Sequence, residues 1–343
     1  MPVTRQTTPD PHPHSTLNRR AFLGTAAMGS LVLSLPRLSA AAARALARPV
    51  RIGVIADLHH DVMHDGVSRM KAFTTRMSEV RPDAIMQLGD FAYPNEANRE
   101  VIELFNQAHP KSLHVIGNHD MDAGMTREAC IKVWGMPARH YVQDVAGLKV
   151  LVLDGNDPGS PTYTGGYKSY VGKEQIDWLK AQLHALEGPI MVVSHQPLAG
   201  SSAVDNAEEI QAILGEAADK VILAVNGHTH IDDVVQAKGV NHLHVNSASY
   251  KWVGGSHQHE SYPKDIHEKH PWIAYTCPYR DPLFAVLTID PETATIRVEG
   301  GKSAWVGKSP EALEVGLSEG LAHGQEVVPA IRDRRITKAL RGS

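Results

Sequence analysis

From Val50 onward, short apolar runs alternate with segments of helical periodicity. Apolar runs of four to seven residues predict buried strands, and apolar positions three and four residues apart predict helices that cover a sheet. The expected strands are 50–56, 84–88, 113–116, 190–194 and 221–225, and the expected helices are 67–80, 96–108 and 173–187. This alternation favours a mostly parallel α/β core.

Paired apolar runs around short turns predict antiparallel hairpins. One covers 141–145 and 149–153, and two more follow residue 230, at 234–236 with 242–245 and at 283–289 with 295–299. Neither a repeat nor a clear linker divides the chain, so we expect a single domain over 48–300. Residues 301–343 are charged and poorly periodic, and we expect a C-terminal extension that forms a loose cap.

The first 47 residues differ from the rest. Residues 1–18 are rich in Pro, Thr and His and show no periodicity, which predicts a disordered leader. Arg19 and Arg20 precede an apolar run over 21–35 and an alanine-rich stretch ending near Ala47, a pattern typical of an export signal. The run is shorter than the ~20 residues that span a bilayer. A membrane anchor or a merely disordered terminus is the alternative.

The arginine pair followed by Phe22 and Leu23 resembles the bacterial twin-arginine signal. Residues 1–47 are therefore expected to be a signal peptide, with the twin-arginine export machinery as a partner. The expected location is periplasmic or secreted.

Composition narrows the functional classes. With 42% hydrophobic and 21% charged residues and a net charge of −4, the chain gives no electrostatic reason to expect nucleic-acid or stable membrane binding. Two cysteines exclude a disulfide-dense scaffold and a Cys-rich zinc module, and the sequence leaves open whether Cys130 and Cys277 pair. The 20 histidines are unusual, and histidine is the commonest metal ligand.

Polar side chains stand at the ends of the expected strands. In open α/β sheets, ligands bind beyond the carboxyl ends of the strands, so side chains distant in sequence should converge there. The residues so placed are Asp57, Asp90, Asn118, His195 and His228. Glycine precedes three of them, as Gly89, Gly117 and Gly227, which permits tight turns and close backbone approach.

Two further histidines complete the expected site. His59 lies two residues after Asp57, and His230 lies two residues after His228, so each pair can point to one side of an extended strand end. Carboxylates, an amide oxygen and imidazoles without a thiolate favour Mn, Fe or Zn over a cysteine-based or all-oxygen site.

Five motifs in this order resemble those of the calcineurin-like metallophosphoesterases. They are Asp57-Leu58-His59, Gly89-Asp90, Gly117-Asn118-His119-Asp120, the isolated His195 and Gly227-His228-Thr229-His230. A Glu-Gln-Ile-Asp-Trp-Leu stretch from Glu174 is similar to the branch that contains phosphodiesterases and purple acid phosphatases. The resemblance implies a four-layer α/β/β/α sandwich of two mixed sheets.

The resemblance also implies a dinuclear site for two divalent or trivalent ions (Mn, Fe or Zn). Asp57, His59 and His230 would hold the first ion, and Asn118, His195 and His228 the second, with Asp90 bridging them. A hydroxide between the ions would attack a small phosphodiester or phosphomonoester. His119 would contact the phosphate and protonate the leaving oxygen, and Asp120 would orient His119.

Particular residues argue against other functional classes. Gly89-Asp90 continues as Phe91-Ala92-Tyr93-Pro94, without the Asp-Arg pair of protein Ser/Thr phosphatases. A catalytically inactive exported metal-binding protein has no need of His119, and Asn118 beside it argues against hydrolysis of a non-phosphate ester.

The remaining histidines and aromatic residues receive plainer interpretations. His60 is expected beside the site, His64 in a loop, and His242 and His244 in the core or at the surface. The stretch from His257 through His259 and His267 to His270 is expected to be a solvated loop, with a substrate-facing cap as the alternative. Four aromatic residues are expected to fill space beneath loops, with stacking on a nucleoside or an organic leaving group as the alternative. They are Tyr163, Tyr167, Tyr170 and Trp252.

Overall fold

The computed structural model describes residues 46–337. All but the last two residues of the expected signal segment lie outside this range. No helix within it combines the length and apolar character needed to cross a bilayer.

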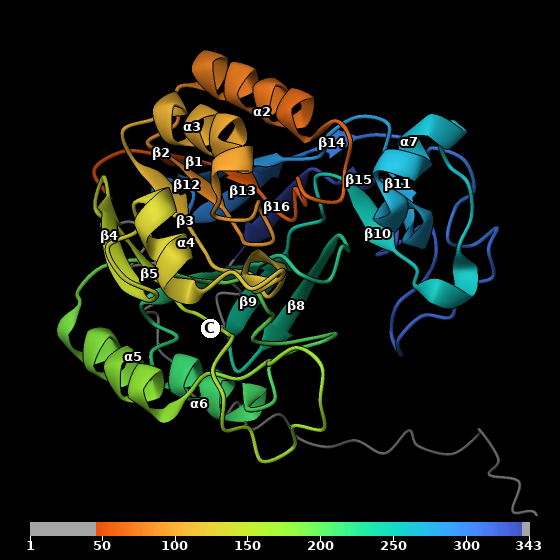
Figure 1. The fold of residues 1–343 in the computed structure, drawn as a ribbon. Coiled ribbons are helices and arrows are strands. Elements are labelled where there is room, and N and C mark those ends of the chain that lie inside the picture. Colours follow the sequence, from red (N-terminus) through yellow and green to blue (C-terminus); the bar gives the residue numbers. More distant parts are fainter. Residues whose placement is uncertain (1–45, 338–343) are drawn as a thin grey trace, which may run out of the picture. The chain divides into compact units, whose positions relative to one another are not determined.

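Two six-stranded mixed sheets form the centre of the described chain (Figure 1). The first has the order β16-β13-β12-β1-β2-β3 and the second β4-β5-β6-β7-β9-β8. The first sheet contains β1 (Val50–Ile55), β2 (Ala84–Gln87), β3 (Ser112–His114), β12 (Ala285–Asp290), β13 (Thr295–Glu299) and β16 (Arg334–Thr337). The second contains β4 (Tyr141–Val145), β5 (Leu148–Val152), β6 (Ile190–Ser194), β7 (Val221–Asn226), β8 (Asp233–Ala237) and β9 (Val240–His244).

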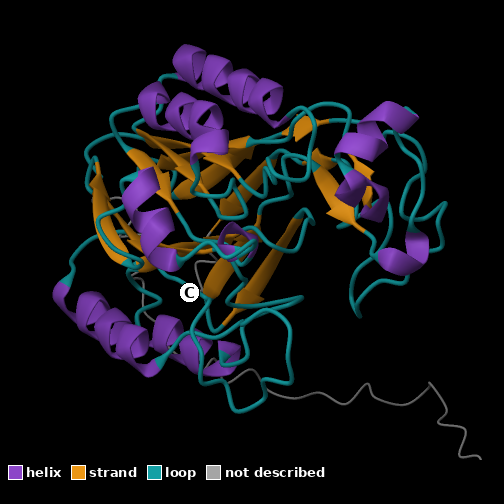
Figure 2. Ribbon diagram, in the orientation of Figure 1, coloured by secondary structure: helices purple, strands orange, loops and turns teal. Residues whose placement is uncertain are grey.

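Helices cover the outer faces of both sheets, which completes the four layers (Figure 2). The helices α2 (Gly66–Val80) and α3 (Arg99–Ala108) lie on the first sheet, and α5 (Lys173–Ala185) and α6 (Ala207–Glu216) lie on the second. One apolar cluster joins residues of both sheets to α2 and α3, and a second joins β5, β6 and β7 to α5 and α6. The expected α/β/β/α sandwich is confirmed.

The apolar runs in the sequence predicted these strands correctly because the strands are buried. Every residue of β2, β6 and β7 is buried, because these strands have neighbours on both sides and packed layers on both faces. Parallel pairing of β1 with β2 and of β2 with β3 brings the carboxyl ends of these strands to one edge of the first sheet. Parallel pairing of β6 with β7 does the same in the second sheet. The loops that follow them carry the polar motifs.

Three segments differ from the sequence-based expectation. The helices α4 (Arg127–Trp134) and α6 were not predicted, although Thr126 caps α4 by accepting a hydrogen bond from the backbone N–H of Ala129. The expected loose cap after residue 300 is wrong, because β14 (Gly301–Lys302) pairs with β15 (Ala330–Ile331) and β16 forms the edge of the first sheet. Its short strands alternate too briefly to give a periodic signal.

The polar stretch after residue 250 is an ordered small lobe (residues 250–278). It contains β10 (Tyr250–Trp252) paired with β11 (Thr276–Pro278), the helix α7 (Lys264–Lys269), and the 3-10 turns η3 (Gly255–His257) and η4 (Pro271–Tyr275). Tyr250 and Ile273 form a separate small core with Met63. This placement contradicts the solvated loop and favours the cap alternative.

Candidate metal centre

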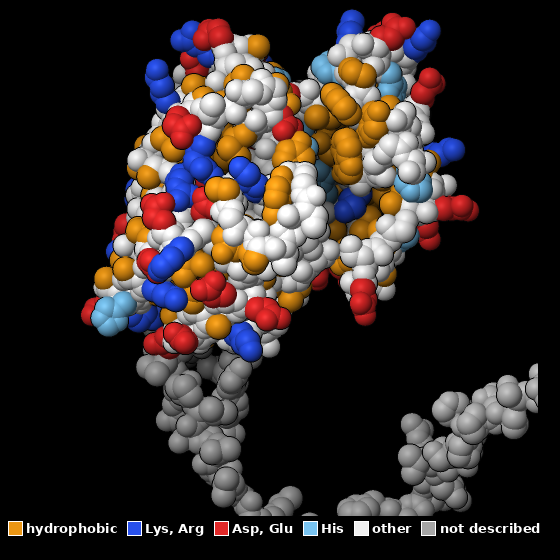
Figure 3. Space-filling model, turned by 60° about the horizontal axis from the view of Figure 1, so that its bottom comes forward, with side chains coloured by type: hydrophobic (Ala, Val, Ile, Leu, Met, Phe, Trp, Pro, Cys, Tyr) orange, Lys and Arg blue, Asp and Glu red, His pale blue; other side chains and the backbone are white. Residues whose placement is uncertain are grey.

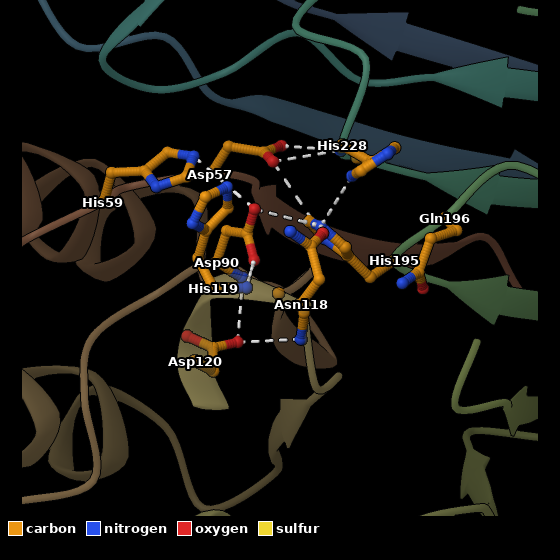
Figure 4. Close-up of polar contacts among 12 residues, drawn as sticks. Asp57, His59, Asp90, Asn118, His119, Asp120, His195, Gln196 and His228 are labelled. Carbon is orange, nitrogen blue, oxygen red and sulfur yellow. Dashed lines mark hydrogen bonds and ion pairs between the residues drawn. The ribbon is translucent and has the colours of Figure 1, made fainter. Parts of the chain in front are cut away.

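Seven side chains converge at the carboxyl ends of five strands, and Figure 4 labels all of them except His230. Their loops follow β1, β2, β3, β6 and β7, and they are the seven ligands expected from the sequence: Asp57, His59, Asp90, Asn118, His195, His228 and His230. All are buried except His228, which is half-buried. The prediction that these residues come together is confirmed.

The backbone at the site is held in an uncommon conformation. Five of the seven residues are non-glycine residues with positive φ: Asp57 (51°), His59 (46°), Asp90 (50°), His228 (69°) and His230 (49°). Each such residue costs of the order of 1 kcal/mol, and such strain clusters at functional sites. Backbone hydrogen bonds between the loops hold it, from the N–H of Asp57 to the carbonyl of Gly89 (3.1 Å) and from His59 to Asp90 (2.8 Å).

The three glycines before the motif residues are required by close approach. A Cβ on Gly117 would lie 2.2 Å from Oδ1 of Asp90, and one on Gly227 would lie 2.5 Å from Oδ2 of Asp57. A Cβ on Gly89, whose φ is +94°, would lie 2.5 Å from Nδ1 of His195. The glycine prediction is confirmed.

Two clusters could each hold a metal ion. Asp57, His59 and His230 form one, with ligand atoms all within 4.8 Å of one another, and Asp90, His195 and His228 form the other. Oδ1 of Asn118 lies 3.1 Å from Nε2 of His195, which adds an amide oxygen to the second cluster. Oδ2 of Asp90 lies 3.1 Å from Nε2 of His195 and 3.6 Å from Nε2 of His59, so its carboxylate touches both clusters.

The histidine nitrogens lie close to one another as well as to the carboxylates of Asp57 and Asp90. Nε2 of His59 lies 3.2 Å from Nε2 of His230, and Nδ1 of His228 lies 3.2 Å from Nε2 of His195. Nδ1 of His230 and Nδ2 of Asn118 are buried with no hydrogen-bond partner among the described residues. Converging imidazole and carboxylate donors, with two buried nitrogens left without a partner, are the arrangement expected around a cation.

The electrostatics also fit cation binding. Burial lowers the pKa of His59, His228 and His230 to about 3 each, which keeps these rings neutral, the form that binds metals. Burial also opposes a charge on His195, but the neighbouring Asp90 outweighs it and raises the pKa of His195 to about 9. A metal ion beside Asp90 would satisfy the same carboxylate that otherwise favours this proton. The residues present therefore fit two ions.

Asp120 has a different role from the one expected. Its buried carboxylate accepts hydrogen bonds from the backbone N–H groups of Asp90 (2.9 Å), Phe91 (2.7 Å) and Gly117 (2.7 Å). It thus fixes the loops that carry Asp90 and Asn118 rather than the ring of His119. The prediction that Asp120 orients His119 is therefore wrong.

The carboxylate that contacts His119 belongs to Asp122, which sequence reasoning missed. Oδ2 of Asp122 lies 2.8 Å from Nδ1 of His119, and the hydroxyl of Tyr167 donates to Asp122 (2.8 Å) while lying 3.1 Å from the same Nδ1. Burial disfavours a charge on His119, but Asp90 and Asp122 outweigh it and raise the pKa of His119. The only sequence signal was an aspartate three residues after the histidine.

A cavity of about 690 Å³ opens over these residues. His119, Tyr167, Trp252 and Trp272 are among the side chains that line it. The expectation that aromatic residues fill space beneath loops is therefore wrong for Tyr167 and Trp252.

Most of the other histidines lie apart from the two clusters. His60 is half-buried beside His59, and His64 packs against Tyr262 of the small lobe with ring centroids 4.5 Å apart. His242 and His244 are buried on β9, which confirms core placement. Cys130 and Cys277 are buried free thiols, so the disulfide left open by the sequence is absent from this structure.

Comparison with known proteins places these motifs in a family. The model of the calcineurin-like phosphoesterases matches residues 50–232. A curated cAMP/cGMP dual specificity phosphodiesterase, MT0825 of Mycobacterium tuberculosis, is 30% identical over 169 residues. That match covers 45% of this chain and 50% of the relative, so the chain spans about half the length of the curated relative it matches.

Of two solved structures compared with this chain, the first shares its fold at low sequence identity. A dimetal phosphatase from Danio rerio superposes with a TM-score of 0.52 at 14% identity, covering 75% of this chain and 98% of that one. A purple acid phosphatase from yellow lupin gives a TM-score of 0.45 at 15% identity, covering 74% of this chain and 51% of that one.

Proposed function

The chain belongs to the calcineurin-like phosphoesterase family, and we propose that it is a metal-dependent hydrolase of phosphodiesters or phosphomonoesters. The observation that carries this proposal is the position of Asp90, whose carboxylate contacts His59 on one side and His195 on the other. One carboxylate shared by two nitrogen-rich clusters suits a pair of neighbouring ions.

In this proposal Asp57, His59 and His230 hold one ion, Asn118, His195 and His228 hold the other, and Asp90 serves both. When bound, the ions supply Lewis-acid activation of water and offset the charge of the phosphoryl oxygens. Mn, Fe or Zn match the mixture of imidazole, carboxylate and amide donors. The chain itself supplies fixed donors and the backbone geometry that aims them.

His119 is the proposed proton donor to the leaving oxygen. It lines the cavity, its backbone N–H donates to Oδ1 of Asp90 (2.8 Å), and its Nδ1 faces Asp122. Nε2 is then the ring atom that can give a proton to substrate. A positioned imidazole in this role typically contributes 10²–10⁴-fold to the rate.

The decisive experiment combines metal analysis with hydrolysis of bis(p-nitrophenyl) phosphate and p-nitrophenyl phosphate by protein reconstituted with Mn, Fe or Zn. We expect two metals per chain and turnover of at least one ester. The variant His119→Ala should retain both metals and lose about 10²–10⁴-fold of the turnover. His64→Ala, an exposed histidine outside both clusters, is the matched control. Two metals without turnover of either ester would instead favour a metal-binding protein without catalysis.

Cyclic nucleotides are one candidate substrate class. The support is the name of the mycobacterial relative, a cAMP/cGMP phosphodiesterase. The match to this chain covers 50% of that relative's length. Release of 5′- or 3′-nucleotide from cAMP or cGMP, measured by chromatography, tests this class directly.

Export is a separate proposal that rests on residues 1–47. Arg19 and Arg20 are the residues that a twin-arginine signal would need. Replacement of both arginines by lysine should leave precursor in the cytoplasm, whereas unchanged export of the double variant would contradict the proposal.

A further inference from the structure

A continuous series of ring contacts crosses the site. Tyr167 meets His119 (centroids 4.6 Å apart), His119 meets His59 (5.2 Å), and His59 stacks on Tyr250 (4.8 Å). From Tyr250 the series continues into the small lobe through Trp252 (6.5 Å), Tyr275 (5.6 Å) and Trp272 (5.2 Å). The series thus joins the proposed proton donor to an aromatic surface on the small lobe.

The aromatic surface is exposed where the cavity opens. Trp252 is 43% exposed and Trp272 55%, and both line the cavity. Together with Tyr167, they are three of the five large hydrophobic side chains exposed among residues 46–337. In Figure 3 hydrophobic side chains gather along the hollow that faces the small lobe. Large apolar side chains exposed together around a cavity mark a binding surface.

The two tryptophans are held by Tyr275 rather than by each other. Trp252 lies almost parallel to Tyr275, with an interplanar angle of 11°, and Trp272 is tilted against the same ring at 46°. Tyr275 ends η4, and Trp252 ends β10, which pairs with β11 directly after Tyr275. The lobe therefore presents a preformed aromatic surface to a ligand.

The charges in the cavity disfavour ligands that carry a second phosphate. Among the described residues that line it, none is lysine or arginine. Lys251, next to Trp252, donates from Nζ to the carbonyl of Thr229 (2.8 Å) instead. A carboxylate, Asp61, does line the cavity, and it accepts from Asn98 and from the backbone of Tyr93. A second phosphate away from the metal site would meet no cation here.

We propose that the aromatic surface of Trp252 and Trp272 binds an uncharged, flat organic group on the substrate, which rests on the proposed phosphoesterase function. His119 lies on the other side of His59 and Tyr250 from Trp252 in the ring series, so the ester arm that leaves points toward His119. The arm that stays on phosphorus then extends toward Trp252. The preferred substrate is a phosphodiester with a single phosphate and an aromatic non-leaving arm.

A series of p-nitrophenyl phosphodiesters tests this arm at a constant leaving group. Its second ester is methyl, phenyl or 1-naphthyl. Because the naphthyl ring would contact both tryptophans, kcat/KM should be about tenfold higher for naphthyl than for methyl, mainly through KM. Trp252→Ala and Trp272→Ala should each lower the naphthyl value several-fold, and by more than they lower the methyl value, so that the naphthyl-to-methyl ratio falls. Trp272→Phe should restore part of the preference.

The matched control is Trp178→Ala, which removes a tryptophan from α5 on the outer face of the second sheet. It should keep the full naphthyl preference. Equal kcat/KM for all three esters in the wild type would overturn the aromatic-arm proposal and leave the phosphoesterase function standing.

If no ester is turned over, a binding measurement tests the aromatic surface separately from the phosphoesterase function. Naphthyl methylphosphonate and the corresponding methyl ester are then titrated into metal-loaded protein, with affinity read by calorimetry. Tighter binding of the naphthyl compound, lost in Trp272→Ala, supports the aromatic surface although hydrolysis has failed. Equal or absent binding overturns it.

Discussion

The ring of His119 is fixed by Asp122, whose Oδ2 lies 2.8 Å from Nδ1 of the histidine three residues earlier. The hydroxyl of Tyr167 donates to the same carboxylate (2.8 Å) from a loop 45 residues away. This contact directs Nε2 of His119 toward substrate and places a negative charge beside the ring.

Asp122→Asn should shift the pH dependence of hydrolysis. Asp122 helps to raise the pKa of His119, and the donor works in its protonated form, so activity falls as the pH rises through that pKa. Loss of the charge lowers the pKa, and the fall in kcat/KM should therefore occur at lower pH. We also expect kcat to drop on the order of tenfold with metal content unchanged.

Tyr167→Phe is the matched control for this prediction. It removes one hydrogen bond to Asp122 but keeps the charge, so the pH profile should stay in place while kcat falls only a few-fold. A profile that is the same in wild type and Asp122→Asn would show that Asp122 does not act through His119.

Asp90→Ala should remove the metal ions from both clusters. Its carboxylate touches both clusters, and Oδ1 also accepts from the backbone of His119, so its removal costs each cluster a charged donor. Metal analysis after dialysis should find fewer than one ion per chain, against two in the wild type. Asp61→Ala, a carboxylate in the same cavity but outside both clusters, should retain both. Full occupancy in Asp90→Ala would refute the shared-ligand assignment.

Gly89→Ala should destabilise the protein and disturb the metal site together. The new Cβ would lie 2.5 Å from His195 and 2.8 Å from the backbone nitrogen of Gly117, at a φ of +94°. Positive φ costs an L residue about 1–2 kcal/mol, and overpacking adds about 1–3 kcal/mol. Denaturant unfolding measures the total.

Gly124→Ala separates these two effects. Gly124 has a φ of +80° but open space around its Cβ position, so only the backbone cost of about 1–2 kcal/mol should remain. Equal free energies of unfolding for the two variants would mean that close approach to His195 contributes nothing.

Arg334→Ala should loosen the loop that follows His230. Asp232 is fully buried and pairs with Arg334 and with Nε of Arg332 (2.6 Å), which ties β16 and the segment before it to the metal-site loop. Leaving a buried carboxylate short of a partner costs about 1–3 kcal/mol. We expect lower stability in denaturant and weaker metal retention, whereas Arg335→Ala, exposed on the same strand, should behave as wild type.

The sequence by itself determined the buried strands and most of the site. Strands such as β6 and β7 are buried on both faces and therefore read as unbroken apolar runs, and parallel pairing sends the residue after each run to one edge. Asp57 and Asp90, which follow β1 and β2, could be placed together for that reason, and so could His195 and His228, which follow β6 and β7. Each motif is a short local sequence, so its ligand residues can be identified without knowledge of their neighbours in the fold.

Only the tertiary structure decided what surrounds those ligands. Asp120 and Asp122 are two residues apart and chemically identical, yet one holds backbone N–H groups while the other holds the ring of His119. The small lobe and β16 gain their order from contacts with residues more than 100 positions away, such as Met63 beside Ile273 and Asp232 beside Arg334. A local pattern cannot report such contacts, because their energy exists only once distant segments have packed.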